Sequence, residues 1–282
     1  MTRTAAVLLL LAAGATWGAT FPVVKAALAD AGPATFLALR FGLAALLLAP
    51  ALRGGLRGPG VWRAVSCGAA LFVGYVFQTW GLASTTPARA AFITALSLVL
   101  VPLLEPVLGI GRATPRVWGG ALLALGGLAI LLRPGTSAFS RGDALTLVCA
   151  VAFAAHVLLL QWTVRVVPPA RASTLQVATA AALALPFAAT ERWRFTPSAR
   201  LVTAVLICAL VATIAAFWVM TAVQRVLSAG VTVVVLAFEP VAAALTSVAM
   251  GLEAPSLGMA FGGLIVVAGV VLAGSALGGS DR

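Results

Sequence analysis

Long apolar runs alternate with short polar and glycine-rich segments along the whole chain. Most runs hold about 20 residues, the length that an α-helix needs to cross the roughly 30 Å hydrocarbon core of a bilayer. The separators carry Gly, Pro, Arg or Asp, which favour turns. The pattern therefore predicts an all-α integral membrane protein with ten transmembrane helices in one compact bundle. The runs are 5–28, 35–52, 61–83, 88–109, 117–132, 144–164, 172–189, 201–223, 227–252 and 257–277.

Two pairs of runs share features that indicate an internal repeat. The fourth and ninth runs each contain a proline after a β-branched middle, at Pro102 and Pro240. The fifth and tenth runs each contain two glycines seven residues apart. Two five-helix units, 1-135 and 136-282, account for both similarities. Because five is odd, the second unit must enter the membrane from the opposite face, so we expect two inverted five-helix repeats with a site between them. The glycines are Gly120, Gly127, Gly262 and Gly269. Small residues allow close helix contact, so we expect the fifth and tenth helices to meet along a glycine seam between the two units.

Composition supports this class. Of the 282 residues, 62% are hydrophobic and 9% are charged, and the mean hydropathy is +1.12, outside the range of soluble domains. Ten spans leave no stretch for a soluble catalytic domain. The run after Arg3 is too long for the apolar part of a signal peptide, so we expect it to persist as the first helix. The three cysteines lie in apolar runs, which argues against a disulfide framework.

The net charge of +11 does not indicate a nucleic-acid partner, because the basic residues lie singly or in small groups between apolar runs. Loops that touch anionic lipid fit that distribution better. With the N-terminus inside, the charge bias favours an inner membrane protein with both termini cytoplasmic. Ten basic residues are then cytoplasmic: Arg3, Arg53, Arg57, Arg63, Arg112, Arg116, Arg165, Arg171, Arg225 and Arg282. Seven are on the other side: Lys25, Arg89, Arg133, Arg141, Arg192, Arg194 and Arg200.

The ninth run contains one carboxylate, Glu239, near its middle and directly before Pro240. An ionised acid at the centre of a membrane helix costs roughly 2.5–3.5 kcal/mol, so Glu239 needs a proton, a cation or a water-filled cavity. Pro240 removes one helical hydrogen bond and predicts a bend beside the acid. Two roles remain open for Glu239. It could couple transport to a proton gradient, or it could stay protonated and join two helices by a hydrogen bond.

Arg40 and Glu105 are further charged residues inside apolar runs. Arg40, in the middle of the second run, cannot easily reach water. It could contact an anionic substrate group, pair with Glu239 or Glu105, or bind helix-end carbonyls, and we favour a structural role. Glu105, near the end of the fourth run, is expected to pair with a loop arginine such as Arg112 or Arg116.

Helical spacing places several residues on shared faces. Trp17 and Phe21 are one turn apart in the first run, and Lys25 follows one turn later, with Pro22 as a hinge. Lys25 could attract anions or extend toward the interface. In the third run, polar groups share one face, which is uncommon in mid-membrane unless they meet another helix or line a cavity. His156, the single histidine, has no metal-ligating cluster beside it and could contact substrate, relay protons or hydrogen-bond within the core. The expected cavity residues are Trp17, Phe21, Tyr75, Gln78, Thr79, His156, Trp218 and Glu239, with hinges at Pro22, Pro102 and Pro240.

Four segments give the chain a resemblance to EamA-type transporters of the drug/metabolite transporter superfamily. They are WGATF at 17–21, TTPARAAFITALSLVLVP at 85–102, Ala155-His156, and FEPV at 238–241 followed by Glu253 nine residues before Gly262. The resemblance implies ten helices in two inverted repeats that move small organic solutes, often outward. The first repeat departs from the pattern, because 109–112 holds no acid where the second repeat has Glu253.

These observations favour a secondary transporter that exports an amino acid, a metabolite or a drug-like compound by alternating access. Nothing resembles a nucleotide-binding loop, so ATP is not expected to drive it, and no cofactor or metal is expected. An intramembrane enzyme would need clustered carboxylates or a metal site, which the sequence does not supply. The alternative is a non-transporting lipid-binding or scaffold protein with a closed apolar core. The expected partners are the bilayer and a small-molecule substrate, and one chain suffices for a monomeric carrier.

Overall fold

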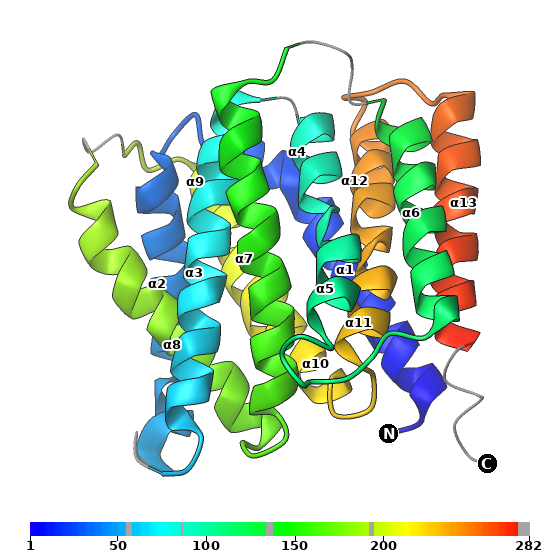
Figure 1. Cartoon of the computed structure of the whole chain (residues 1–282). Coiled ribbons are helices and arrows are strands. Elements are labelled where there is room, and N and C mark those ends of the chain that lie inside the picture. The colour runs from blue at the N-terminus through cyan, green and yellow to red at the C-terminus, as the bar shows by residue number, and fades with distance from the viewer. Residues whose placement is uncertain (55–57, 86, 134–137, 192–194, 276–282) are drawn as a thin grey trace.

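The computed structural model describes residues 1–54, 58–85, 87–133, 138–191 and 195–275, and these residues are almost entirely helical (Figure 1). Some of the predictions concern residues outside these ranges. They are the charges at Arg57, Arg192, Arg194 and Arg282, position 86 of the fourth-run motif, and the boundary between the predicted repeats at 135/136.

The apolar runs correspond to helices within the described ranges, and some of these helices are broken. The unbroken ones are α1 (Arg3–Ala27), α2 (Pro33–Leu48), α3 (Val61–Ser84), α6 (Pro115–Leu132), α7 (Arg141–Thr163), α8 (Pro169–Ala188) and α13 (Leu257–Ser275). A 3₁₀ turn, η1 (Ala49–Gly54), extends α2. The broken ones are α4 (Pro87–Thr94) with α5 (Ser97–Leu104), α9 (Ala199–Ala209) with the π-helical turn η2 (Leu210–Ala215) and α10 (Ala216–Val223), and α11 (Ala229–Leu236) with α12 (Phe238–Ala249).

Among the described residues, 8 helical segments are long and apolar enough to cross a membrane by length and composition. The fourth run gives a shorter apolar helix, Arg89–Leu104. The seventh run forms α8, which has 20 residues but is not among the segments apolar enough to cross a membrane. Its first two turns contain Arg171 and the polar residues Ser173, Thr174 and Gln176, which lower its hydropathy. The chain is a multi-pass helical membrane protein.

Hydroxyl and proline residues define many of the helix starts. Side-chain oxygens accept backbone N–H groups of the first turn, which otherwise lack partners. Ser140 and Asp143 form a reciprocal capping box at the start of α7. The other hydroxyl caps are Thr2, Thr114, Ser198 and Ser228, and prolines occupy the first turn of α2, α6 and α8.

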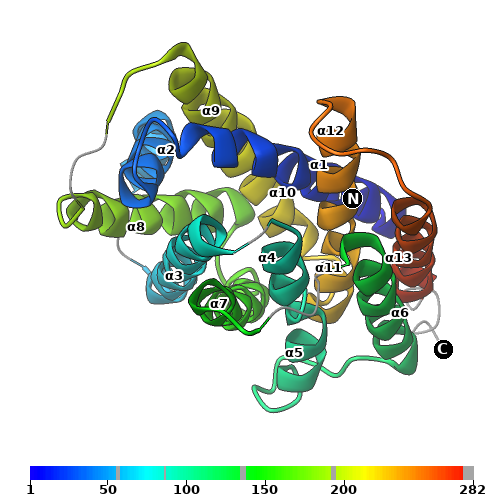
Figure 2. The same cartoon turned by 90° about the horizontal axis from the view of Figure 1, so that it is seen from above.

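Helices from the first half of the chain pack in pairs with helices from the second half: α6 on α13, α3 on α7, α1 on α12, and α2 on α8 (Figure 2). The α6–α13 pair meets through glycines. A Cβ on Gly120 would lie 2.6 Å from the carbonyl oxygen of Gly269, and one on Gly127 would lie 2.7 Å from that of Gly262. Only glycine permits this backbone-to-backbone contact. The predicted glycine seam between the fifth and tenth runs is confirmed.

The predicted bends at proline lie somewhat earlier in the chain than expected. In the ninth run, the helix breaks at Ala237, before Pro240. The proline ring conflicts with the carbonyl four residues earlier, at Leu236, so the regular hydrogen-bond pattern fails there. In the fourth run, the break is at 95–96, and Pro102 lies inside α5. Pro22 lies within α1, which continues from Arg3 to Ala27 without a break.

Candidate functional site

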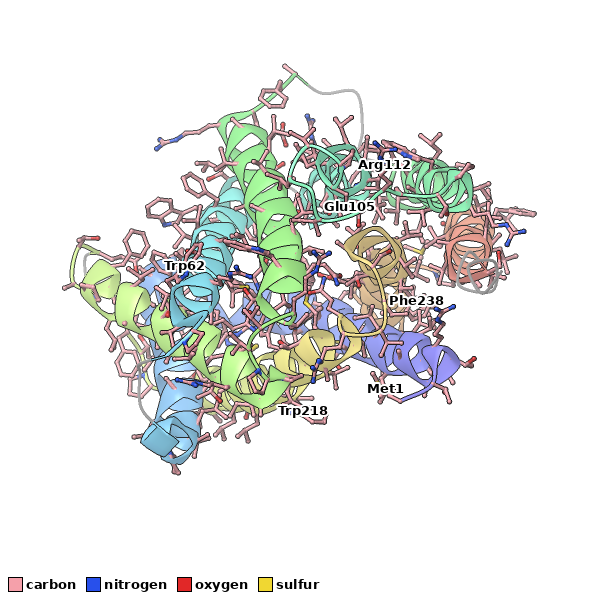
Figure 3. The ribbon with its side chains drawn as sticks, turned by 60° about the horizontal axis from the view of Figure 1, so that its bottom comes forward. Met1, Trp62, Glu105, Arg112, Trp218 and Phe238 are labelled. Atoms are coloured by element: carbon pink, nitrogen blue, oxygen red, sulfur yellow. The ribbon has the colours of Figure 1, made fainter. Side chains whose placement is uncertain are left out.

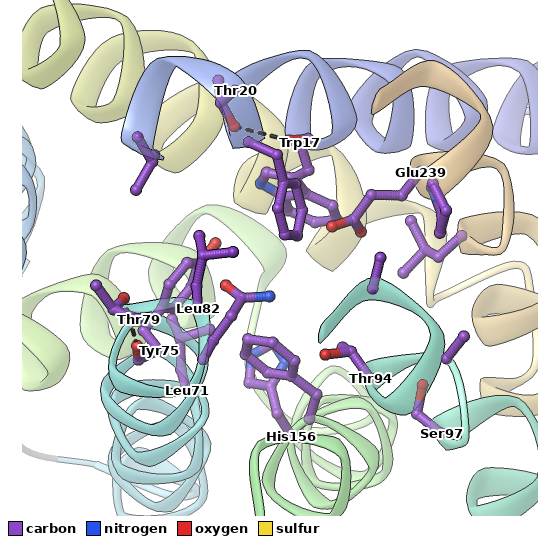
Figure 4. Close-up of a pocket in the computed structure, with 18 of the residues that line it drawn as sticks. Trp17, Thr20, Leu71, Tyr75, Thr79, Leu82, Thr94, Ser97, His156 and Glu239 are labelled. Carbon is purple, nitrogen blue, oxygen red and sulfur yellow. Dashed lines mark hydrogen bonds between the residues drawn. The ribbon is translucent and has the colours of Figure 1, made fainter. Parts of the chain in front are cut away.

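A cavity of about 130 Å³ lies inside the bundle, lined by side chains from α1 to α5 and from α7, α10, α11 and α12 (Figure 4). An apolar cavity of about 150 Å³ can hold benzene, so this one suits a group the size of a small aromatic ring. Its wall is mixed, with aromatic rings and several polar groups. Of the predicted cavity residues, Trp17, Phe21, Tyr75, Gln78, Thr79, His156 and Glu239 line it.

Trp218 does not line this cavity, so its predicted placement was wrong. Its side chain is 51% exposed on the outer surface of the bundle (Figure 3). The neighbouring Phe217 is 3% exposed and lines the cavity instead. Successive residues of a helix point about 100° apart, so only one of the two can face inward. Sequence alone did not determine which one does.

Glu239 lies in the first turn of α12, just after the break at Ala237. Its side chain points into the cavity (Figure 4). The described residues offer it no hydrogen bond and no ion pair, and their two salt bridges are Arg89–Asp143 and Arg200–Asp30. Its oxygens are not among the fully buried unpartnered atoms, so they are open to the cavity. The interhelical hydrogen bond of the structural alternative is therefore not made to any described residue.

Arg40 also lines the cavity, and its contacts match the structural role that we favoured. Its Nε donates to Thr213 Oγ1 at 2.8 Å, and its Nη2 donates to Tyr75 OH at 3.1 Å and to Ala212 O at 3.2 Å. The guanidinium lies 4.5 Å from the centre of the Tyr75 ring. Trp17 Nε1 donates to the same Ala212 oxygen at 2.7 Å. The π-helical turn η2, a feature often found at functional sites, thus anchors both side chains.

Aromatic rings form one side of the cavity around Phe217. Trp17 lies 5.0 Å from this ring between centroids, Tyr75 lies 6.2 Å away, and His156 lies 5.8 Å away in an edge-to-face arrangement. Phe153 contacts Tyr75 at 5.4 Å. Such contacts fix ring orientation, so the wall is preorganised rather than loosely packed.

His156 belongs to a buried hydrogen-bond chain that the sequence did not reveal. Its Nε2 lies 2.8 Å from Gln176 Oε1, and Gln176 Nε2 donates to Thr221 Oγ1 at 2.9 Å. Thr221 Oγ1 donates to Phe217 O at 2.5 Å. The Cys67 thiol donates weakly to Gln176 Oε1 at 3.6 Å. The only sequence signal was a single amide, Gln176, within the alanine-rich seventh run.

Glu105 does not pair with a loop arginine, and that prediction was wrong. It is 1% exposed, and its Oε1 accepts the backbone N–H of Gly230 at 2.8 Å. Its Oε2 is buried without a partner among the described residues. Arg116 donates instead to Ser275 O at 3.1 Å, and Arg112 is exposed. The free N–H groups and the positive dipole at the start of α11 attract the carboxylate.

A second cavity, of about 400 Å³, adjoins the first. The two share Phe21, Ala91 and Pro240, which stand between them. The second cavity also contacts Pro22, Lys25 and Glu253, together with residues near the C-terminal ends of α6 and α12. The Lys25 ammonium donates to Leu82 O at 2.8 Å. Together the cavities trace a path from Glu239 toward that end of the bundle.

Within the described ranges, no group of three or more His, Cys, Asp or Glu side chains could hold a metal ion. Cys67, Cys149 and Cys208 are buried free thiols.

The described residues thus form a bundle of spanning helices around a partly polar internal cavity. The model of the EamA-like transporter family matches residues 4–133 and again 140–275, and the chain belongs to this family. An uncharacterized transporter of Archaeoglobus fulgidus is 33% identical over 256 residues, which cover 91% of this chain and 81% of the relative. A protein of known crystal structure superposes with a TM-score of 0.82 and 24% identity over the full length of both chains, which shows the fold alone. The protein is therefore a membrane transporter and not an enzyme.

Proposed function

We propose that this protein is a secondary transporter that exports a small organic solute, such as an amino acid, a metabolite or a drug-like compound, by alternating access. The observation that carries the proposal is the placement of Glu239. This carboxylate faces the cavity without a partner among the described residues. A membrane acid in that position can take up and release a proton or a cationic group. We assign proton coupling to Glu239.

Inverted repeats would provide the alternating-access movement. Three observations support ten transmembrane helices in two units, 1-135 and 136-282. The family model matches the chain twice, each time over one unit. The fourth and ninth runs are both broken before a proline. The glycine contacts of α6 and α13 are reciprocal, because Gly120 opposes Gly269 and Gly127 opposes Gly262.

The distribution of charge supports an inner membrane location with cytoplasmic termini. Helices α3 and α6 begin at the end of the bundle that holds the N-terminus, and α7 ends there (Figure 1). Arg63, Arg112 and Arg165 lie in or next to these helix ends, and none of them belongs to the two salt bridges of the described residues. The opposite end mixes acids and bases, as in the Arg200–Asp30 and Arg89–Asp143 pairs. An excess of arginine marks the cytoplasmic side. The second cavity would then lead away from the cytoplasm, as export requires.

The alternative function, a lipid-binding or scaffold protein, should close its core with apolar side chains. A cavity lined by Glu239, Gln78 and His156 favours a carrier over a scaffold. Nothing in the sequence favours ATP or a cofactor as the driving force.

Uptake into proteoliposomes tests the proposal, with a panel of amino acids and cationic drugs and with or without an imposed pH gradient. Glu239→Gln should abolish accumulation driven by the gradient but leave exchange of the same solute across the membrane. Glu191→Gln, at an acid that lines neither cavity, is the matched control and should keep gradient-driven uptake. Unchanged proton-driven transport by Glu239→Gln would exclude the coupling role. No movement of any compound under any gradient would favour the scaffold.

A further inference from the structure

We infer that His156 is a specificity-determining residue of the cavity, held by Gln176 as the Nε2–H tautomer so that its Nδ1 accepts a hydrogen bond from an N–H donor of the solute. The simplest such solute is a primary ammonium on a small aromatic or apolar body. This inference rests on the proposed function, since it names the chemistry of the ligand that the same cavity would carry.

The hydrogen-bond chain fixes the orientation of the Gln176 amide. Thr221 donates its single hydroxyl proton to Phe217 O at 2.5 Å, so its oxygen can only accept from Gln176. The group of Gln176 that lies 2.9 Å from Thr221 must therefore be the NH₂ donor, and its carbonyl oxygen must face His156. The Cys67 thiol, a donor, approaches the same carbonyl oxygen.

The amide orientation in turn fixes the tautomer of His156. Gln176 Oε1 can only accept, so the His156 nitrogen 2.8 Å away must carry a proton. In a neutral imidazole, the other nitrogen, Nδ1, is then an acceptor with a free lone pair. The buried hydrogen-bond chain therefore determines that the His156 ring offers an acceptor at Nδ1.

Nδ1 is available to a ligand. It has no hydrogen-bond partner among the described residues, although His156 as a whole is only 2% exposed. It is also absent from the fully buried unpartnered atoms, which belong to Glu105, Gln161, Gln224 and Thr232. Because His156 lines the cavity, the open nitrogen is reachable from there. An unpaired acceptor in a largely apolar site favours a ligand that supplies a donor.

The other polar groups of the cavity point to the same ligand chemistry. Three of the five N–H donors of Arg40 are already bonded to Thr213, Ala212 and Tyr75. Glu239 adds a second open acceptor. The aromatic ring of Trp17 suits a cationic or aromatic body. A primary ammonium supplies the N–H donors that the two open acceptors, His156 Nδ1 and Glu239, can bind, and its positive charge complements the Glu239 carboxylate.

The tautomer can be observed directly, because His156 is the only histidine in the chain. Protein labelled with ¹⁵N-histidine and purified without a histidine tag gives ring signals from this residue alone. We expect Nε2 to be protonated and Nδ1 to be bare. Gln176→Met should produce a mixture of tautomers. Gln161→Met is the control, because it alters a glutamine of α7 that does not bond His156, and it should leave the spectrum unchanged. A protonated Nδ1 with a bare Nε2 in the parent protein would overturn the inference.

A matched pair of probes tests the ligand chemistry. Benzylamine and benzyltrimethylammonium have the same ring and charge, but only the first has N–H donors. Calorimetry in detergent should show benzylamine binding at least about tenfold more tightly, a difference of about 1.4 kcal/mol. His156→Leu should remove that preference, while His156→Asn, which keeps an acceptor near the Nδ1 position, should retain most of it. Equal affinities in the parent protein, no binding of either probe, or an unchanged preference in His156→Leu would each overturn the inference.

Failure of this inference and failure of the transport proposal give different results. Binding that prefers benzylamine and depends on His156, without movement of any solute into proteoliposomes, supports the inference and contradicts transport. Transport of solutes without any preference for N–H donors supports the proposed function and contradicts the role of His156. The parent spectrum and the parent affinities need no variant, so misfolding of a variant cannot obscure the outcome.

Discussion

Gly18 of α1 lies directly against the backbone of Glu239 in α12. A Cβ on Gly18 would overlap the carbonyl oxygen of Glu239, and it would lie 2.9 Å from both Ala242 Cβ and Ala243 N. The helix that carries the cavity acid therefore touches α1 through backbone atoms, one residue after Trp17. The position of the acid depends on the absence of a side chain at Gly18.

Gly18→Val should move α12 away from α1 and displace Glu239. We expect a loss of transport and a destabilisation of about 1–3 kcal/mol, the usual cost of overpacking. Thermal melting followed by size-exclusion chromatography, together with uptake into proteoliposomes, measures both effects. Gly126→Ala is the control, because a Cβ there meets no atom within 4 Å. A Gly18→Val protein with parental stability and transport would show that the contact is not required.

Arg40→Lys should destabilise the protein although it keeps the charge. Lysine cannot reproduce the planar fork that bonds Thr213, Ala212 and Tyr75 together. Each buried group left without a partner costs about 1–3 kcal/mol. Tyr75→Phe removes a single one of these bonds and should lower the melting temperature less. If Arg40→Lys melts like the parent protein but transports poorly, Arg40 contacts substrate rather than holding the helices.

Phe21→Ala should join the two cavities. Phe21 lines both, with Ala91 and Pro240, so removal of its ring widens the passage between them. We expect faster uptake of bulky aromatic solutes and reduced discrimination against them, measured as initial rates in proteoliposomes. Val73→Ala, at an exposed position of α3, serves as the control. Unchanged rates for solutes of every size would place the path elsewhere.

Asp30 gives the fold a stability contribution that depends on pH. In the loop after α1, its carboxylate accepts hydrogen bonds from Arg200 and Ser198, which lower the pKa of Asp30 from 3.8 to about 2. A depressed folded-state pKa means that the contribution is complete above the unfolded pKa and is lost as the pH falls through the folded value. We therefore expect the melting temperature to fall between about pH 4 and pH 2.

In Asp30→Asn that part of the pH dependence should disappear, and Glu253→Gln should leave it in place. An equally steep acid dependence in Asp30→Asn would assign it to another carboxylate. The Asp30–Arg200 ion pair joins the α1–α2 loop to the start of α9. The backbone N–H of Thr196 also donates to Asp30 O at 2.8 Å.

Much of this arrangement could be predicted from the sequence, because the bilayer imposes strong constraints on it. Apolar runs of span length gave the positions of the helices, and the paired glycines gave the contact between α6 and α13. Glu239 could be identified as a cavity residue, since a lone acid in an apolar run needs a polar environment.

The failures share one physical cause. Contacts between helices depend on rotation and register, which a single sequence does not specify. The apolar periodicity could not distinguish Phe217 from Trp218, and nothing linked Gln176 of α8 to His156 of α7. Glu105 was assigned to the loop arginines nearest in sequence, whereas its partner is Gly230 in the other half of the chain.

The glycine contacts between α6 and α13 have a mechanical consequence. At Gly120 and Gly127 these two helices meet backbone against backbone, so neither position has a side chain of its own that could rearrange. Sliding by one residue would drive a larger side chain into the neighbouring backbone. We therefore expect this pair to stay fixed, so that any opening of the path would come from the other helices that line the two cavities.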